Sequence, residues 1–305
     1  MKKILLALLL MLPCFVNAME IEKVFIDSEI EIAGGLYVRE IIVVKNQDQD
    51  LNLNVYLSDK SLMDFDGSVE SFIGSKIYNA TDVSIKNIST IKDGTDVNEM
   101  YKENFKENYL TEIKNYKLDT KDGYTTIKLK NTNKTVTYYL EYSITNILVE
   151  HNDCAEFYYR YFDKFDYDIK SVSIITRLPN ESKLFEVWAH GNKKNSTVSK
   201  DINSYLVLNE IKEYKKNTFL DNRIIFDKDL FMININKDKK SNINAIDLIK
   251  QTEKELEKSV DVNLIRWLLY GSCVFLMILI CAYVVYRKRT KKNWHSFIMN
   301  VIINL

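Results

Sequence analysis

Apolar and polar residues alternate along several segments of the chain, and this alternation predicts β-strands. Between Val136 and Ile144 every second residue is apolar or aromatic, which is the two-residue period of a half-buried strand. The segment Tyr124–Lys130 precedes it across a polar connection of hairpin length. We therefore expect these two segments to pair as an antiparallel hairpin.

The beginning of the chain predicts another hairpin. The segments Val24–Ile32 and Leu36–Val44 flank Ala33-Gly34-Gly35, where glycine permits the positive backbone angles of a tight turn. Further strands are expected at residues 169–178, 184–189, 205–208 and 223–226. The expected fold class is mainly β: an antiparallel β-sandwich-like extracytoplasmic domain over residues 19–236, or two subdomains with a boundary near residues 145–170.

Two segments have helical spacing instead. Asp96–Ile113 carries apolar and aromatic residues at steps of four, which is typical of a surface helix or a long excursion. Asn244–Val260 has a capping residue in Asn244 and apolar residues at helical spacing. No proline or glycine separates it from the apolar run that follows, so we expect residues 237–263 to form a linker and a juxtamembrane stalk helix.

Two apolar runs near the ends of the chain predict its place in the cell. Residues 1–18 join a lysine pair, a short apolar run and Val16-Asn17-Ala18, which is typical of a cleaved signal peptide. Residues 264–286 are almost wholly apolar, with aromatic residues at both ends, as in a transmembrane α-helix. The short basic tail, residues 287–305, should stay in the cytoplasm. The sequence predicts a single-pass cell-membrane protein with its N-terminal domain outside.

The charge balance narrows the expected partners. Lys plus Arg equals Asp plus Glu at 42 each, so no basic field favours nucleic acid. The lipid bilayer is the expected partner of the apolar run. Another membrane or envelope protein is the expected partner of the exported domain.

Catalytic and metal-binding constellations are incomplete. Cys154 is the one thiol expected in the mature exported domain, so an intramolecular disulfide is excluded there. A nucleophile formed by Cys154 with His151 is less favoured than a buried structural thiol or an intermolecular disulfide. The three histidines lack metal-ligand spacing, and no phosphate loop or dinucleotide fingerprint is found, so we expect no metal and no cofactor. Glu150 with Glu156 could perform acid–base chemistry on a glycan, but nothing fixes their separation.

Aromatic residues concentrate between Phe157 and Tyr167, with Trp188 beyond them. One strand face cannot bury all these rings, so some should be accessible at a carbohydrate, peptide or protein contact. The alternative is that the tyrosines simply cover a sheet. The candidate interaction surface consists of Tyr158, Tyr159, Tyr161, Phe165, Tyr167 and Trp188.

The order of these segments resembles the bacterial membrane proteins that share domain of unknown function 2207. The resemblance rests on the early stretch Ala33–Glu40, on Tyr138–Tyr142, on Glu156-Phe157-Tyr158-Tyr159 and on the strand that ends in Leu178-Pro179. It covers Ile21–Phe231, and Asp48–Leu62 lacks the glycine- and arginine-containing loop of the compared members. The resemblance implies topology and fold and no known activity.

These observations favour a non-catalytic interaction or envelope-assembly module, not an enzyme. One alternative is an extracytoplasmic ligand sensor that acts through a partner membrane protein, since the short tail carries no output domain of its own. The other is an envelope hydrolase that uses a carboxylate pair.

Overall fold

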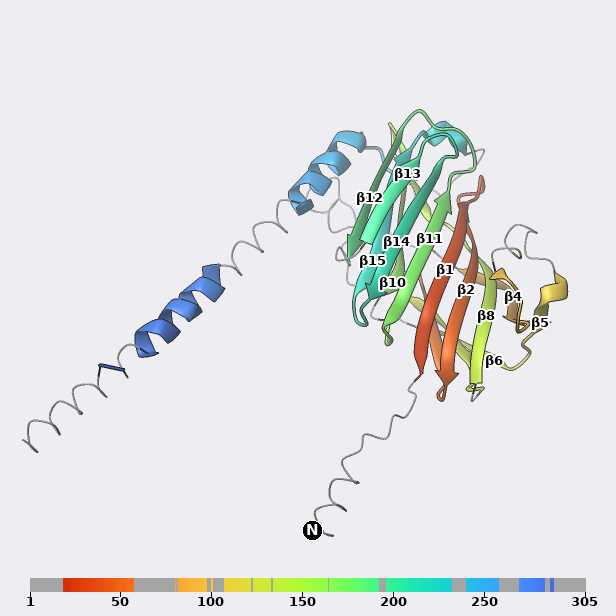
Figure 1. Cartoon of the computed structure of the whole chain (residues 1–305). Helices are drawn as coiled ribbons and strands as arrows, with labels where there is room; N and C mark the ends of the chain where they lie inside the picture. The colour runs from red at the N-terminus through yellow and green to blue at the C-terminus, as the bar shows by residue number, and fades with distance from the viewer. Residues whose placement is uncertain are drawn as a thin grey trace, which may run out of the picture. The chain divides into compact units, whose positions relative to one another are not determined.

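The computed structural model describes residues 19–57, 80, 82–97, 100, 107–121, 123–132, 134–163, 165–191, 196–231, 240–257, 269–282 and 286–287. The chain divides into two compact units, Met1–Leu248 and Ile249–Leu305. The first unit holds all fifteen strands given below and is mainly β, as expected (Figure 1). The predicted signal peptide lies outside the described residues.

The largest sheet has eight strands and contains the predicted first hairpin. Its spatial order is β13 (Ser196–Asp201), β14 (Leu206–Tyr214), β11 (Ile169–Arg177), β1 (Glu20–Ile30), β2 (Leu36–Gln47), β8 (Lys134–Ile144), β4 (Val83–Ile91) and β5 (Leu110–Glu112). Gly34 has a φ of 76°, so the turn between β1 and β2 uses the left-handed region that glycine tolerates.

One strand pair departs from the expected antiparallel arrangement, because β1 and β11 pair in parallel. These strands are far apart in sequence, and a long connection allows parallel pairing, whereas a tight turn enforces the antiparallel kind.

Two smaller sheets complete the domain. One has the order β12 (Phe185–Gly191), β15 (Phe219–Phe226), β10 (Ala155–Asp163) and β9 (Leu148–Glu150). The other has the order β3 (Leu51–Tyr56), β7 (Tyr124–Leu129) and β6 (Tyr116–Lys121). Single 3-10 turns occupy η1 (Glu107–Tyr109) and η2 (Lys228–Leu230).

The predicted pairing of residues 124–130 with the strand at 136–144 is wrong. β7 pairs with β3 and β6, and β8 pairs with β2 and β4. Both edges of each strand are occupied by other partners, so closeness in sequence does not decide the pairing.

The core lies between the eight-stranded and the four-stranded sheets. One buried cluster contains inward residues of both, such as Val24 and Ile42 from the first and Phe157 and Ile224 from the second. Polar contacts cross the same space: the Tyr161 hydroxyl lies 2.8 Å from Ser28 Oγ and 2.7 Å from Thr176 Oγ1.

The predicted stalk segment is helical over residues 246–257. Its expected cap was Asn244, but the Asp153 carboxylate accepts hydrogen bonds from the Ala245 N–H at 2.7 Å and the Ile246 N–H at 3.2 Å. A carboxylate at a helix N-terminus satisfies free N–H groups and favours the helix dipole. The loop after β9 therefore holds the first turn of this helix.

The predicted membrane span is described in part. Residues 269–282 are helical, whereas residues 264–268 and 283–285 lie outside the described residues. No helix of the described residues is both long and apolar enough to cross a bilayer.

Candidate functional site

Alternate residues of β10, β15 and β12 project from the four-stranded sheet on the side away from the core, because successive strand residues point to opposite faces. Pairing aligns them in rows: Tyr158 lies opposite Arg223, which in turn lies opposite Trp188. In the next row Asp221 stands between Arg160 and His190. We call this set of side chains the charged face; it consists of Glu156, Tyr158, Arg160, Glu186, Trp188, His190, Asp221 and Arg223. Glu156, Asp221 and Arg223 are 0%, 1% and 2% exposed, so only the half-buried members of the set reach solvent.

Glu156 is the buried centre of one ion-pair network. Its Oε1 accepts a hydrogen bond from Arg223 Nε at 2.6 Å, and its Oε2 lies 2.8 Å from His151 Nε2. Burial raises the pKa of Glu156, but the charge of Arg223 and the hydrogen bonds with His151 and Arg223 outweigh burial, so the pKa lies below its usual value. The carboxylate is therefore ionised and already paired, which suits a structural ion pair better than an acid–base catalyst.

Asp221 forms the second network of the charged face. Arg160 donates to it with two nitrogens, from Nε to Oδ1 at 2.7 Å and from Nη2 to Oδ2 at 3.0 Å. The Arg160 guanidinium also lies 4.9 Å from the centroid of the Phe219 ring. A bidentate arginine–carboxylate pair of this kind fixes the orientation of both side chains and orders this part of the sheet.

Aromatic and cationic groups share one row of the charged face. The Arg223 guanidinium lies 5.1 Å from the centroid of the Tyr158 ring, and the Tyr158 hydroxyl lies 3.2 Å from His190 Nδ1. Tyr158, Trp188 and His190 are each half-buried, so part of each ring reaches solvent. Such a mixture of tyrosine, tryptophan and arginine is enriched where proteins contact one another.

The structure divides the six predicted surface residues. Tyr158 and Trp188 come together on the charged face. Tyr159, Tyr161 and Phe165 are 2%, 7% and 6% exposed, so the expectation that these three rings reach a surface is wrong. The first two alternate with Tyr158 along β10 and point into the core, where burial raises the pKa of each hydroxyl.

The sixth predicted surface residue, Tyr167, lies in the loop after β10. It packs against Phe165 with ring centroids 5.5 Å apart. It is half-buried and does not belong to the charged face.

Cys154 is a buried free thiol, one of the two forms expected. Burial raises its pKa well above the usual value, and the carboxylates of Asp153 and Glu156 add to the effect. The thiolate needed for nucleophilic attack is thus disfavoured. In the described part of the chain, no three His, Cys, Asp or Glu side chains are grouped so that they could hold a metal ion.

Sequence reasoning missed the charged residues of β15. Asp221 and Arg223 are two positions apart in an otherwise largely apolar strand, and that spacing is the available signal that both lie on one face. Their partners, Arg160 and Glu156, lie more than sixty residues away in the sequence, so the pairing itself has no local signal.

A carboxyl group between the sheets was also missed. Glu40 of β2 is 8% exposed, and its Oε2 accepts a hydrogen bond from the Tyr142 hydroxyl at 3.3 Å. Burial raises its pKa to about 7, although the hydrogen bond from Tyr142 opposes the shift. Its protonation therefore changes close to neutral pH.

The model of the N-terminal domain of a predicted membrane protein family, DUF2207, matches residues 20–226. The chain belongs to this family. The match covers the strands from β1 to β15 and so includes the whole charged face. No curated protein matches the chain.

Solved structures with some likeness are much larger proteins. Leukotriene A4 hydrolase from Saccharomyces cerevisiae has a TM-score of 0.38 at 6% identity, over 68% of this chain and 30% of that one. An M1 zinc metallopeptidase from Deinococcus radiodurans has a TM-score of 0.31 at 8% identity, over 67% of this chain and 42% of that one. The chain thus spans less than half the length of each.

Proposed function

We propose that this protein is an exported, membrane-anchored interaction or envelope-assembly module without catalytic activity, and that the charged face is its contact surface. The partner is another membrane or envelope protein. The signal-like N-terminus, the apolar run at residues 264–286 and the basic tail support the topology. Membership of a family described as membrane proteins agrees with an anchored domain.

The observation that carries the proposal is that the carboxylates at the centre of the charged face are already ion-paired. Glu156 is paired with Arg223 and Asp221 with Arg160, so each carboxylate already has a cation as partner. The half-buried rings of Tyr158 and Trp188 are partly accessible to a partner, and Arg223 of the first ion pair packs against the Tyr158 ring. Rigid aromatic anchors beside arginine commonly provide most of the binding energy at an interface.

The hydrolase alternative is poorly supported by the same geometry. An acid catalyst needs a carboxyl group that can give up a proton to the substrate, and Glu156 is buried and ionised. Glu150 forms an ion pair with Lys240 at 3.1 Å, so its carboxylate already has a cationic partner as well.

The test is quantitative recovery of cross-linked membrane partners with full-length variants. Trp188→Ala and Tyr158→Ala should each weaken the complex by about 2 kcal/mol, which is roughly thirtyfold in the dissociation constant. Tyr116→Ala is the matched control, because Tyr116 is a half-buried ring on β6 of the three-stranded sheet. Recovery per folded molecule that is equal for all three variants would contradict the proposal.

A further inference from the structure

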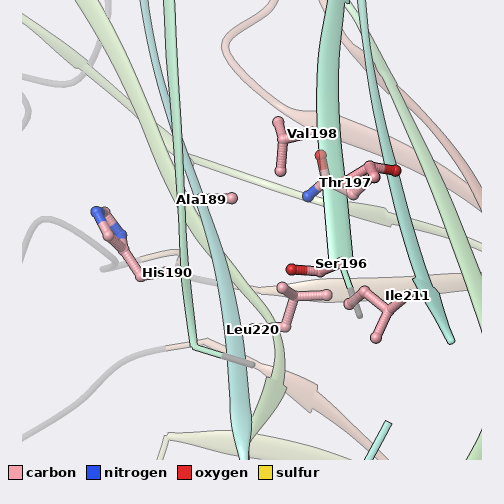
Figure 2. A pocket seen from close by; sticks show the side chains of 8 residues that line it. Ala189, His190, Ser196, Thr197, Val198, Ile211 and Leu220 are labelled. Atoms are coloured by element: carbon pink, nitrogen blue, oxygen red, sulfur yellow. The ribbon is translucent and has the colours of Figure 1, made fainter. Parts of the chain in front are cut away.

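A cavity of about 220 Å³ lies between the two sheets (Figure 2). It is at the edge formed by β12, the last strand of the four-stranded sheet, and β13, the last strand of the eight-stranded sheet. Its apolar wall comes from Ala189, Val198, Ile211 and Leu220. His190 also belongs to the lining, although Figure 2 shows its ring on the other side of β12 from Ala189.

Ser196, Thr197 and Asn209 make part of the cavity polar, in addition to His190. Ser196 lines it, and Figure 2 shows its hydroxyl pointing between the two edge strands. Asn209 of β14 also lines it and is 1% exposed. A hydroxyl both donates and accepts hydrogen bonds, so Ser196 offers either function to a bound molecule.

The amide of Asn209 is only half satisfied. Its Nδ2 donates to Oδ1 of Asn222, which is 0% exposed and lies opposite Ala189 on β15. Among the described residues, Asn209 Oδ1 and Asn222 Nδ2 have no hydrogen-bond partner. If both amides turn over, the free atoms become Asn209 Nδ2 and Asn222 Oδ1, so one donor and one acceptor are unpaired in either arrangement. A buried polar atom without a partner destabilises the fold, and a bound group that pairs with it would remove that cost.

We propose that this cavity is a binding site for a small neutral molecule that carries an amide or a hydroxyl group. Such a group donates and accepts at once, so it matches Asn209 in both amide arrangements. A carboxylate or an ammonium ion would match one arrangement only. It would also enter a space that, among the described residues, is lined by no Asp, Glu, Lys or Arg, and burying an unpaired charge is strongly unfavourable.

The size of the cavity suits a ring-sized ligand. An engineered apolar protein cavity of about 150 Å³ holds benzene, so 220 Å³ has room for a benzene ring with an amide attached. The apolar wall would contact the ring while Asn209 and Ser196 contact the amide. This inference does not depend on the charged face being an interaction surface.

The experiment is a fluorine NMR titration of the full-length protein in lipid nanodiscs. The probes are 4-fluorobenzamide and 4-fluorobenzoate, which have nearly the same shape and differ in charge. We expect saturable line broadening with the amide and a dissociation constant at least tenfold lower than for the carboxylate. Equal binding of the two probes, or no saturable broadening with either, as for a cavity that holds only water, would overturn the proposal.

Substitutions of residues that line the cavity test whether the probe binds there. Ala189→Leu fills the cavity and should weaken 4-fluorobenzamide binding at least tenfold. Val198→Trp narrows the mouth and should do the same; because Val198 is 42% exposed on an edge strand, this change does not overpack the core. Ser199→Ala is the control on the same strand, outside the lining residues, and should leave binding unchanged. Unchanged binding in a folded blocking variant would overturn the proposal.

Discussion

Replacing Glu40 by glutamine should stabilise the β domain at neutral and alkaline pH. Glutamine has nearly the shape of a protonated glutamic acid and carries no charge, so it removes the cost of burying a carboxylate between the sheets. Glu40 is 8% exposed, and among the described residues Tyr142 is its one hydrogen-bond partner. One hydrogen bond is a weak compensation for a buried charge.

The size of the effect follows from the pKa. Burial raises the pKa of Glu40 from 4.5 to about 7 in the folded protein. The folded state therefore holds a proton more tightly than the unfolded state, and the free energy of unfolding falls as the pH rises from about 4.5 to about 7. A shift of this size corresponds to roughly 3 kcal/mol, since one pKa unit is about 1.4 kcal/mol.

The assay is denaturant unfolding of the full-length protein at pH 5 and pH 8, followed by circular dichroism. Glu40→Gln should change stability little at pH 5 and raise it by up to about 3 kcal/mol at pH 8. Glu210→Gln, on an exposed position of β14, is the matched control and should stay within about 0.5 kcal/mol at both pH values. A Glu40→Gln variant less stable than the parent at pH 8, or a difference independent of pH, would refute the reasoning.

Single substitutions test two side-chain contacts and the proposed membrane topology. Arg223→Leu leaves Glu156 buried without its arginine and should lower the free energy of unfolding by about 3 to 5 kcal/mol in a denaturant titration. Adding Glu156→Gln to this variant should recover part of the lost stability. Equal stability of the single and the double variant would count against the ion-pair account. Asp153→Ala should speed hydrogen exchange at the Ala245 and Ile246 amides and lower the free energy of unfolding by about 1 kcal/mol. Asn152→Ala, at the exposed neighbouring position, is the control and should change neither quantity. Equal exchange rates in the two variants would show that the Asp153 carboxylate does not hold the start of the helix. A cysteine introduced at the exposed position Ser199 should react with an impermeant maleimide on intact spheroplasts; labelling only after lysis would reverse the proposed topology.

Local features of this fold were predictable, and non-local ones were not. The β1–β2 hairpin follows from Gly34, because the turn needs a positive φ that its own sequence permits. Most strands follow from two-residue alternation. The parallel pair of β1 with β11 and the pairing of β7 with β3 join distant segments, and no local pattern specifies them.

The candidate site shows the same division. Alternation along β10 separates Tyr158 from Tyr159, but which face meets the core depends on the opposing sheet, and so Tyr159 and Tyr161 were assigned to a surface that they do not reach. Glu40 closes the early stretch Ala33–Glu40 on which the family resemblance rests, yet its burial appears only when Tyr142 is placed beside it. Polar residues paired across the fold carry no signal in a single sequence.

The central claim is that the charged face meets a membrane or envelope partner, and site-specific photo-cross-linking tests it most directly. A photoreactive phenylalanine analogue is placed at Trp188 on β12, or at Tyr116 on β6 as control, and intact cells are irradiated. We predict that position 188 gives a discrete protein adduct, that position 116 does not, and that Tyr158→Ala in the same chain reduces the adduct at 188. Equal adducts at both positions, or none at 188 in a folded and exported protein, would contradict the account.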